Sequence, residues 1–212
     1  MALFLNKKKK SMSDTFYFLE KLSIYDVVQS WALYRDTGDW EGLRSTVHPD
    51  GQMTATWFDG SFEDFISAIQ ASWRNGSKSQ HFLGGTVAQV NGNKALAQTR
   101  MSIMVRGTLD HQVVDITCTG RFYDRVEKRD GKWKILKRNV IYEKDRLDLL
   151  DPSSSLTLDP QRLSQYPEGY QHLAYLQSSH GAHVSPHLAT GSGAALDALV
   201  LQAHEWLNAP SA

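Results

Sequence analysis

The chain of 212 residues contains only one cysteine, Cys118. A single cysteine cannot form an internal disulfide, so the sequence excludes the small secreted folds that disulfides hold together. Cys118 also lies on the apolar side of a predicted strand, which favours a packed thiol over a nucleophile. We therefore expect a protein of a reducing compartment and predict a cytoplasmic location.

The chain also lacks an excess of charge, because 23 Lys and Arg residues balance 23 Asp and Glu residues. Binding to nucleic acid phosphates requires a basic excess, so we expect no nucleic acid partner. No apolar run reaches the roughly 18 residues of a membrane span, so we expect no membrane partner either.

The lysines at positions 7–10 follow a short apolar stretch, which is the reverse of the order in a secretory signal. A lysine run of this kind is typical of a disordered tail, and we predict one over residues 1–15. The alternatives are a patch for an anionic surface and a nuclear targeting signal.

Residues 16–150 carry the pattern of one globular domain. Apolar residues at helical spacing predict helices over 16–35, 40–47 and 61–75, and a turn cluster at 48–51 ends the second helix. Alternation with a period of two predicts strands over 52–58, 86–90, 94–105, 111–126 and 132–142. Helices followed by long antiparallel strands are typical of an α+β fold.

The remaining residues, 151–212, form a separate extension. They begin with a proline and three serines, and helical patterns return only over 167–177 and 194–207. Such short helices cannot build a core of their own. We expect this helical extension to pack on the domain or on a neighbouring subunit, where it could cap a pocket.

Asp36 stands where helix chemistry disfavours an acid. It lies in the last predicted turn of the first helix, just before Gly38 and the N-cap candidate Asp39. The negative end of the helix dipole costs a carboxylate there about 0.3–1 kcal/mol and predicts a raised pKa. A perturbed acid is a candidate for proton chemistry, and a solvated turn acid is the alternative.

His81 is the second candidate, because it precedes an apolar pair and the glycines at 84 and 85. Together with the Asp36 turn and the Asp-Gly-Lys-Trp hairpin at 130–133, this motif resembles the SnoaL-like group of the nuclear-transport-factor-2-like superfamily. That group includes scytalone dehydratase, hexachlorocyclohexane dehydrochlorinase and bile acid 7α-dehydratase. The resemblance covers about residues 17–152.

The resemblance implies a cone-shaped, cystatin-like fold, in which the helices pack inside a strongly curved antiparallel sheet. It also implies a homo-oligomer, either a trimer or a dimer. Asp36 and His81 take the positions of a catalytic dyad that uses no cofactor and no metal. The expected substrate pocket is a set of aromatic and sulfur-containing side chains: Trp31, Tyr34, Trp57, Met104, Phe122 and Tyr142.

Two departures from scytalone dehydratase predict a different substrate. Arg35 stands at the position of one of its tyrosines, with Tyr34 adjacent, and its second histidine falls near Met104. The apolar set around Trp31 favours a larger and more apolar ligand, although aromatics at this spacing also build ordinary cores.

A carboxylate that orients an imidazole makes an acid–base pair suited to eliminations and isomerisations. The sequence therefore predicts a lyase of the dehydratase type that acts on a small apolar polyketide-, steroid- or terpenoid-like substrate. An isomerase with the same dyad and a non-catalytic ligand-binding or assembly module are the alternatives. The histidines at 180, 183 and 187 suggest a metal site less well than a flexible loop.

Overall fold

The computed structural model describes the backbone of residues 2–76 and 78–210, and the side chains from residue 14 onward within those ranges. The predicted tail at 1–15 falls almost wholly on residues whose side chains are not described, and it stays a prediction. The elements in chain order are α1 (Ala2–Thr37), α2 (Trp40–Ser45), β1 (Val47–Ala55), β2 (Phe58–Ser61), α3 (Phe62–Arg74), β3 (Ser79–Asn91), β4 (Lys94–Leu109), β5 (Gln112–Arg129), β6 (Lys132–Leu149), α4 (Pro160–Leu163), α5 (Gln171–Ser179) and α6 (Ala194–Asn208).

The strands form one sheet in the order β2-β1-β6-β5-β4-β3, in which only the β1–β6 pair is parallel. Register shifts interrupt the ladders at several points, including the step between Thr119 and Gly120. Such bulges bend a strand and increase its twist. A Cβ added to Gly120 would lie 2.0 Å from the carbonyl oxygen of Ile141, so this bend requires glycine.

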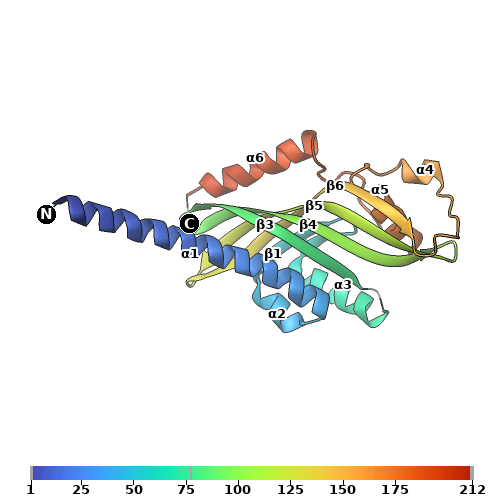
Figure 1. Ribbon diagram of the computed structural model, residues 1–212, viewed down its shortest axis with the longest axis horizontal. Coiled ribbons are helices and arrows are strands. Elements are labelled where there is room, and N and C mark those ends of the chain that lie inside the picture. The colour runs from blue at the N-terminus through green and yellow to red at the C-terminus, as the bar shows by residue number, and fades with distance from the viewer. Residues whose placement is uncertain (1, 77, 211–212) are drawn as a thin grey trace.

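Helices cover both faces of the curled sheet (Figure 1). α1, α3 and α5 share one large core cluster with the inner face, while Ala203 and Leu207 of α6 pack on Leu96, Tyr123 and Ile141 of the outer face. The prediction of an α+β fold with helices packed in a curved antiparallel sheet is confirmed. Cys118 is fully buried on the inner face, and burial raises the pKa of its thiol, as expected of a packed cysteine.

Most strands are longer than predicted, one predicted turn is wrong, and the strand predicted over 52–58 ends at Ala55 and is followed by the unpredicted β2. Residues 48–51 belong to β1, where a register shift between Val47 and Gln52 accommodates the proline and glycine. β3 begins at Ser79 and β6 continues to Leu149, because the ladders of β4 and β5 continue alongside them. Residues typical of turns therefore occur at bulges within the strands of this sheet as well as at the ends of strands.

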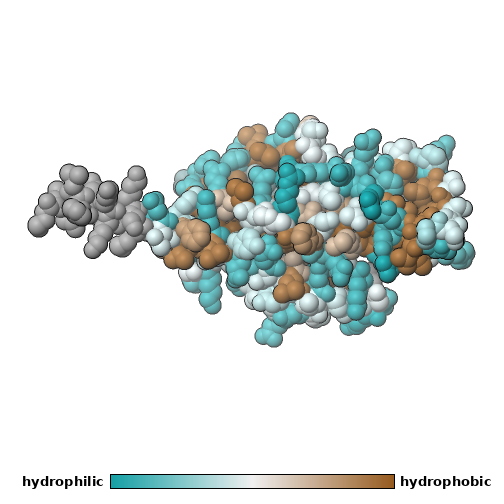
Figure 2. Space-filling view, viewed as in Figure 1, coloured by the Kyte–Doolittle hydropathy of each residue, from teal (hydrophilic) through white to brown (hydrophobic). Residues whose placement is uncertain are grey.

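α1 leaves the body of the protein at its N-terminal side, and apolar side chains are exposed where it does so (Figure 2). The exposed large apolar residues of this part of the helix are Phe16, Tyr17, Phe18, Leu19, Leu22 and Tyr25. Among the described residues, no helix combines the length and apolar character that crossing a bilayer requires.

Candidate active site

Asp36 and His81 meet at the junction of α1 and β3. Nδ1 of His81 lies 2.8 Å from Oδ1 of Asp36, and the backbone N–H of His81 donates to Oδ2 of the same carboxylate. The side chain of His81 is only 5% exposed and that of Asp36 only 14%. The carboxylate thus holds both the backbone and the ring of His81, which fixes the orientation of the imidazole.

The two glycines after His81 have a structural role in this arrangement. β3 shifts register against β4 between Leu83 and Thr86, so Gly84 and Gly85 form a bulge. Gln29 of α1 donates to the carbonyl oxygen of Gly84 at 3.4 Å. The bulge therefore turns β3 beside α1, and it brings His81 to the end of the helix that carries Asp36.

The electrostatics make Asp36 an anion and leave His81 neutral. Burial acts to raise the pKa of Asp36, but the hydrogen bonds from His81 and the charge of Arg35 together place it below its ordinary value. The raised pKa predicted from the helix dipole is therefore wrong. Burial lowers the pKa of His81 below its usual 6.5, assisted by the charges of Arg35 and Arg138, and the hydrogen bond to Asp36 only partly opposes this.

A neutral His81 beside an ionised Asp36 has one consistent tautomer. An ionised carboxylate accepts hydrogen bonds and cannot donate them, so Nδ1 must carry the proton. Nε2 is then left with a free lone pair and can act as a base. The geometry thus gives His81 the protonation state that proton abstraction requires.

The imidazole faces a small cavity between the sheet and the helices. The volume of this cavity is about 40 Å³, which is room for only a few water molecules. The aromatic and aliphatic side chains that dominate the wall include Trp31, Trp57, Phe65, Phe122, Tyr142 and Leu173. A larger ligand therefore requires part of this wall to move.

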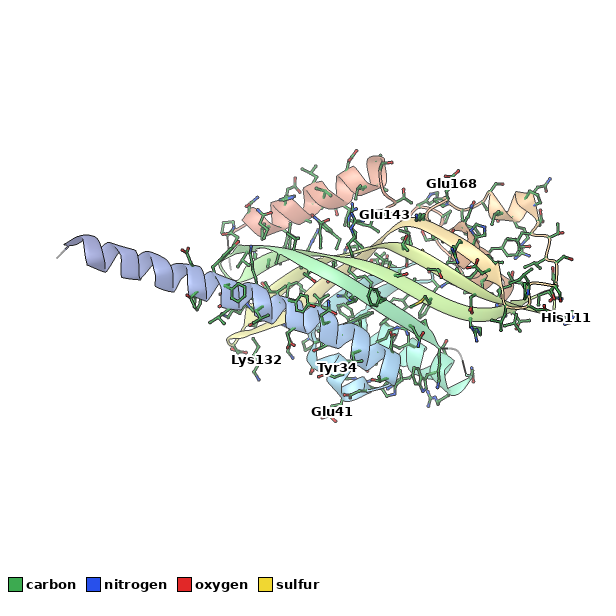
Figure 3. The ribbon with its side chains drawn as sticks, viewed as in Figure 1. Tyr34, Glu41, His111, Lys132, Glu143 and Glu168 are labelled. Atoms are coloured by element: carbon green, nitrogen blue, oxygen red, sulfur yellow. The ribbon has the colours of Figure 1, made fainter. Side chains whose placement is uncertain are left out.

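Four of the six expected pocket residues line the cavity, namely Trp31, Trp57, Phe122 and Tyr142, whereas two do not. Tyr34 lies on the side of α1 that faces α2, where it packs close to Gly42 (Figure 3). Met104 is partly exposed, because its neighbour Ile103 faces the cavity and side chains alternate along a strand. Neither Tyr34 nor Met104 lines the cavity beside His81.

Ten residues of the wall were not predicted as site residues, and three of them bear on the chemistry or on the closing of the cavity: Arg35, Leu173 and Gln177. Arg35 was noted only as a departure from a tyrosine position. Leu173 and Gln177 come from α5 in the extension, and they occupy successive turns of one helix face. No local motif marks them, because only the docking of α5 brings them to the cavity.

Asp145 of β6 fixes the start of α5. Its carboxylate accepts the backbone N–H groups of His172 and Leu173 at 2.7 and 2.8 Å, and it lies 2.8 Å from Nδ1 of His172. The Asp145 side chain is fully buried. A single acid thus satisfies two of the free N–H groups of the first turn and holds the helix that closes the cavity.

Replacing Asp145 by alanine is expected to loosen α5 without unfolding the sheet. The loss of an acceptor from buried donors costs about 1–3 kcal/mol, so the α5 amides should exchange with solvent about tenfold to a hundredfold faster. Hydrogen exchange measured by mass spectrometry checks this. Asp148→Ala is the control, because Asp148 lies on the same strand but pairs at the surface with Arg146 at 2.8 Å. Equal exchange in the two variants would contradict the role of Asp145.

No group of three or more His, Cys, Asp and Glu residues within 2–76 and 78–210 is arranged to hold a metal ion. Of the histidines at 180, 183 and 187, His180 turns back onto its own helix, where Nδ1 lies 2.9 Å from the carbonyl oxygen of Leu176.

Comparison with known proteins identifies the family. The profile of the SnoaL-like domain matches residues 18–139. The chain belongs to this SnoaL-like family. A PEP2-like protein of Fusarium vanettenii is 30% identical to this SnoaL-like protein over 200 residues, which cover 89% of this chain and 86% of the relative. Pea pathogenicity protein 2 of the same fungus is 30% identical over 164 residues, with 76% and 70% of the two chains covered.

Solved structures share the fold of the SnoaL-like protein. A type 2 hexachlorocyclohexane dehydrochlorinase superposes with a TM-score of 0.56 at 16% identity, over 69% of this chain and 98% of that one. A candidate scytalone dehydratase from Novosphingobium aromaticivorans gives 0.54 at 16% identity, over 68% and 99%. At such low identity these neighbours show a common fold alone.

Proposed function

We propose that this SnoaL-like protein is a cofactor-independent lyase. It removes water or another β-leaving group from a small, largely apolar polyketide-, steroid- or terpenoid-like compound. The observation that carries the proposal is the buried Asp36–His81 pair, whose free Nε2 faces an aromatic cavity. Two proteins that share this fold are named for eliminations, which supports the proposal.

His81 takes a proton through Nε2 from a carbon next to an electron-withdrawing group. The imidazolium that forms is stabilised by the ionised Asp36, which already accepts the Nδ1 proton. The electron pair left on carbon then forms a double bond as the β-substituent departs, and Nε2 returns the proton to a departing hydroxide. Positioned proton transfer of this kind typically contributes about 10²–10⁴-fold to the rate.

A reaction in deuterium oxide separates this proposal from its alternatives. The probe is a bicyclic β-hydroxy ketone whose elimination yields a fluorescent naphthol. A lyase produces naphthol, whereas an isomerase with the same dyad exchanges the α-hydrogen for deuterium and retains the hydroxyl group. A non-catalytic binding module does neither, although the ketone raises its melting temperature. Exchange or binding without naphthol would overturn the lyase proposal for this class of substrate.

The pH dependence of turnover should follow His81. As a base, His81 works only in its neutral form, and burial places its pKa below 6.5. We therefore expect kcat/KM to be constant through neutral pH and to fall on the acid side only below about pH 6.5. A pH–rate profile measures this, and an acid limb centred above pH 7 would contradict a buried neutral imidazole.

The expected homo-oligomer, a dimer or a trimer, stays a prediction that light scattering can measure.

A further inference from the structure

Arg35 places a positive charge beside the dyad, and this charge is only partly used by the protein. Its side chain is 14% exposed, and it lines the same cavity as His81. Nη1 donates to Oδ1 of Asp36 at 3.2 Å. Within the part of the chain that the structure describes, Nε and Nη2 of Arg35 form no hydrogen bond with another residue. Most of the guanidinium is thus free to bind something else.

A second arginine shows what a purely structural role looks like in this protein. Arg138 is fully buried, and it donates through Nε and Nη2 to both oxygens of Asp124, at 2.8 and 2.7 Å. This fork-to-fork geometry is a strong form of compensation for burying a guanidinium, although Nη1 of Arg138 is buried without a hydrogen bond among the described residues. Arg35 makes one longer contact instead, with a carboxylate that His81 already engages twice. Burial of Arg35 is therefore poorly compensated by the protein itself.

The cavity wall contains other polar atoms that lack a partner or a full set of partners. Nε1 of Trp31 and Oε1 of Gln177 are buried without a hydrogen bond among the described residues. The hydroxyl of Tyr142, which also lines the cavity, accepts the backbone N–H of Thr56 at 3.2 Å. An unsatisfied buried polar group is unfavourable, so these atoms point to a ligand that carries oxygen.

We propose that Arg35 binds the oxygen of a substrate carbonyl group and holds the negative charge that this oxygen acquires when His81 removes the neighbouring proton. The inference rests on the proposed function and deepens it, because it makes the substrate a β-hydroxy or β-substituted carbonyl compound. Arg35 is then a catalytic residue, in contact with the reacting group.

The charges of the site balance before and after this step. Before proton transfer, Asp36 and Arg35 form one ion pair and His81 is neutral. Afterwards the enolate oxygen lies beside Arg35 and the imidazolium lies beside Asp36, so each charge still has an opposite neighbour. The carbon–hydrogen pair of electrons moves into the enolate, returns to form the carbon–carbon double bond, and expels hydroxide, which takes the proton from Nε2 and leaves as water.

Binding of p-nitrophenol tests this assignment without turnover. Its phenolate oxygen imitates the enolate oxygen, and its absorbance reports whether the bound molecule is ionised. It is also a single-ring probe, which suits a cavity that has room for only a few water molecules. The full chain is titrated at a pH where the free phenol is mostly neutral. We expect the wild type to bind the ionised form and to increase its absorbance.

Arg35→Met should weaken binding of the ionised form about tenfold to a hundredfold, which is the range for a hydrogen bond to a charged group. Arg35→Lys should recover part of it, because lysine keeps the charge. Arg100→Met is the matched control, since Arg100 pairs with Glu143 and its side chain is 71% exposed. Circular dichroism of each variant confirms that the fold is retained.

The outcomes separate this inference from the lyase proposal. Ionised binding that depends on Arg35 supports the assignment, and His81→Gln should then retain this binding while losing turnover. If the wild type binds p-nitrophenol only in its neutral form or not at all, or if Arg35→Met binds the ionised form as well as the wild type, the assignment is overturned. Undiminished turnover in His81→Gln would overturn the lyase and leave the Arg35 anion site standing.

Discussion

Replacing His81 by glutamine is expected to lower turnover about 10²–10⁴-fold while the fold persists. Glutamine has a similar length and can still donate to Asp36, but it has no lone pair of comparable basicity in place of Nε2. Asp36→Asn should also lower turnover, because an amide oxygen stabilises the imidazolium less well than a carboxylate does. Both effects should appear in kcat, since the two groups act on the reacting proton.

The chain offers a matched control for this experiment. His172 contacts Asp145 in the same way that His81 contacts Asp36, with Nδ1 to Oδ1 at 2.8 Å and a backbone N–H to Oδ2. His172 is absent from the cavity lining. His172→Gln should therefore change turnover by no more than a few-fold. Similar losses in both histidine variants would indicate a general structural effect and remove the support for His81 as the base.

Replacing Arg138 by methionine is expected to destabilise the folded protein by about 3–5 kcal/mol. Arg138 and Asp124 are both fully buried, so removal of the arginine leaves an uncompensated carboxylate in the core. The guanidinium also lies between two cavity residues, 4.1 Å from the ring centre of Trp31 and 3.9 Å from that of Phe122. Its loss should therefore loosen the cavity wall as well.

Urea unfolding at neutral pH measures this loss as a lower midpoint. The double variant with Asp124→Leu and Arg138→Met should recover most of the stability, because no charge is then left buried without a partner. Arg106→Met is the surface control. Its ion pair with Asp115 joins β4 and β5, as the buried pair joins β6 and β5, but the side chains are 60% and 38% exposed, and such pairs contribute about 0–1 kcal/mol. Equal losses for Arg138 and Arg106 would show that burial of the pair is not decisive.

The pairing of Asp36 with His81 was implied by the resemblance to the SnoaL-like group, which rests on motifs that can be recognised locally in the sequence. Asp36 ends a helix beside a glycine turn, and His81 precedes the two glycines that form the β3 bulge. The prediction that failed was the direction of the pKa shift of Asp36. Its helix position argues for a raised pKa, but two hydrogen bonds from a residue 45 positions away reverse the direction. Such long-range contacts have no local signature.

The rest of the site depended on packing. Met104 fits an apolar pocket by residue type, but the register of β4 turns Ile103 inward and Met104 outward. Leu173 and Gln177 belong to a short helix of the extension, where no pattern indicates a cavity. Arg35 looked like a departure from a tyrosine position, and only its burial beside His81 made it a candidate for binding an oxygen.

The three N-terminal helices, the long antiparallel strands that follow them and the hairpin turns between those strands were determined by the sequence itself, because apolar spacing and special residues such as glycine act over a few neighbours. The tertiary structure alone decided the length of the strands, the protonation of the dyad and the closing of the cavity by α5. These depend on contacts between residues far apart in the chain, where burial and charge set the energies. The cavity wall thus joins α1, the sheet and the extension at one place, and only folding brings them together.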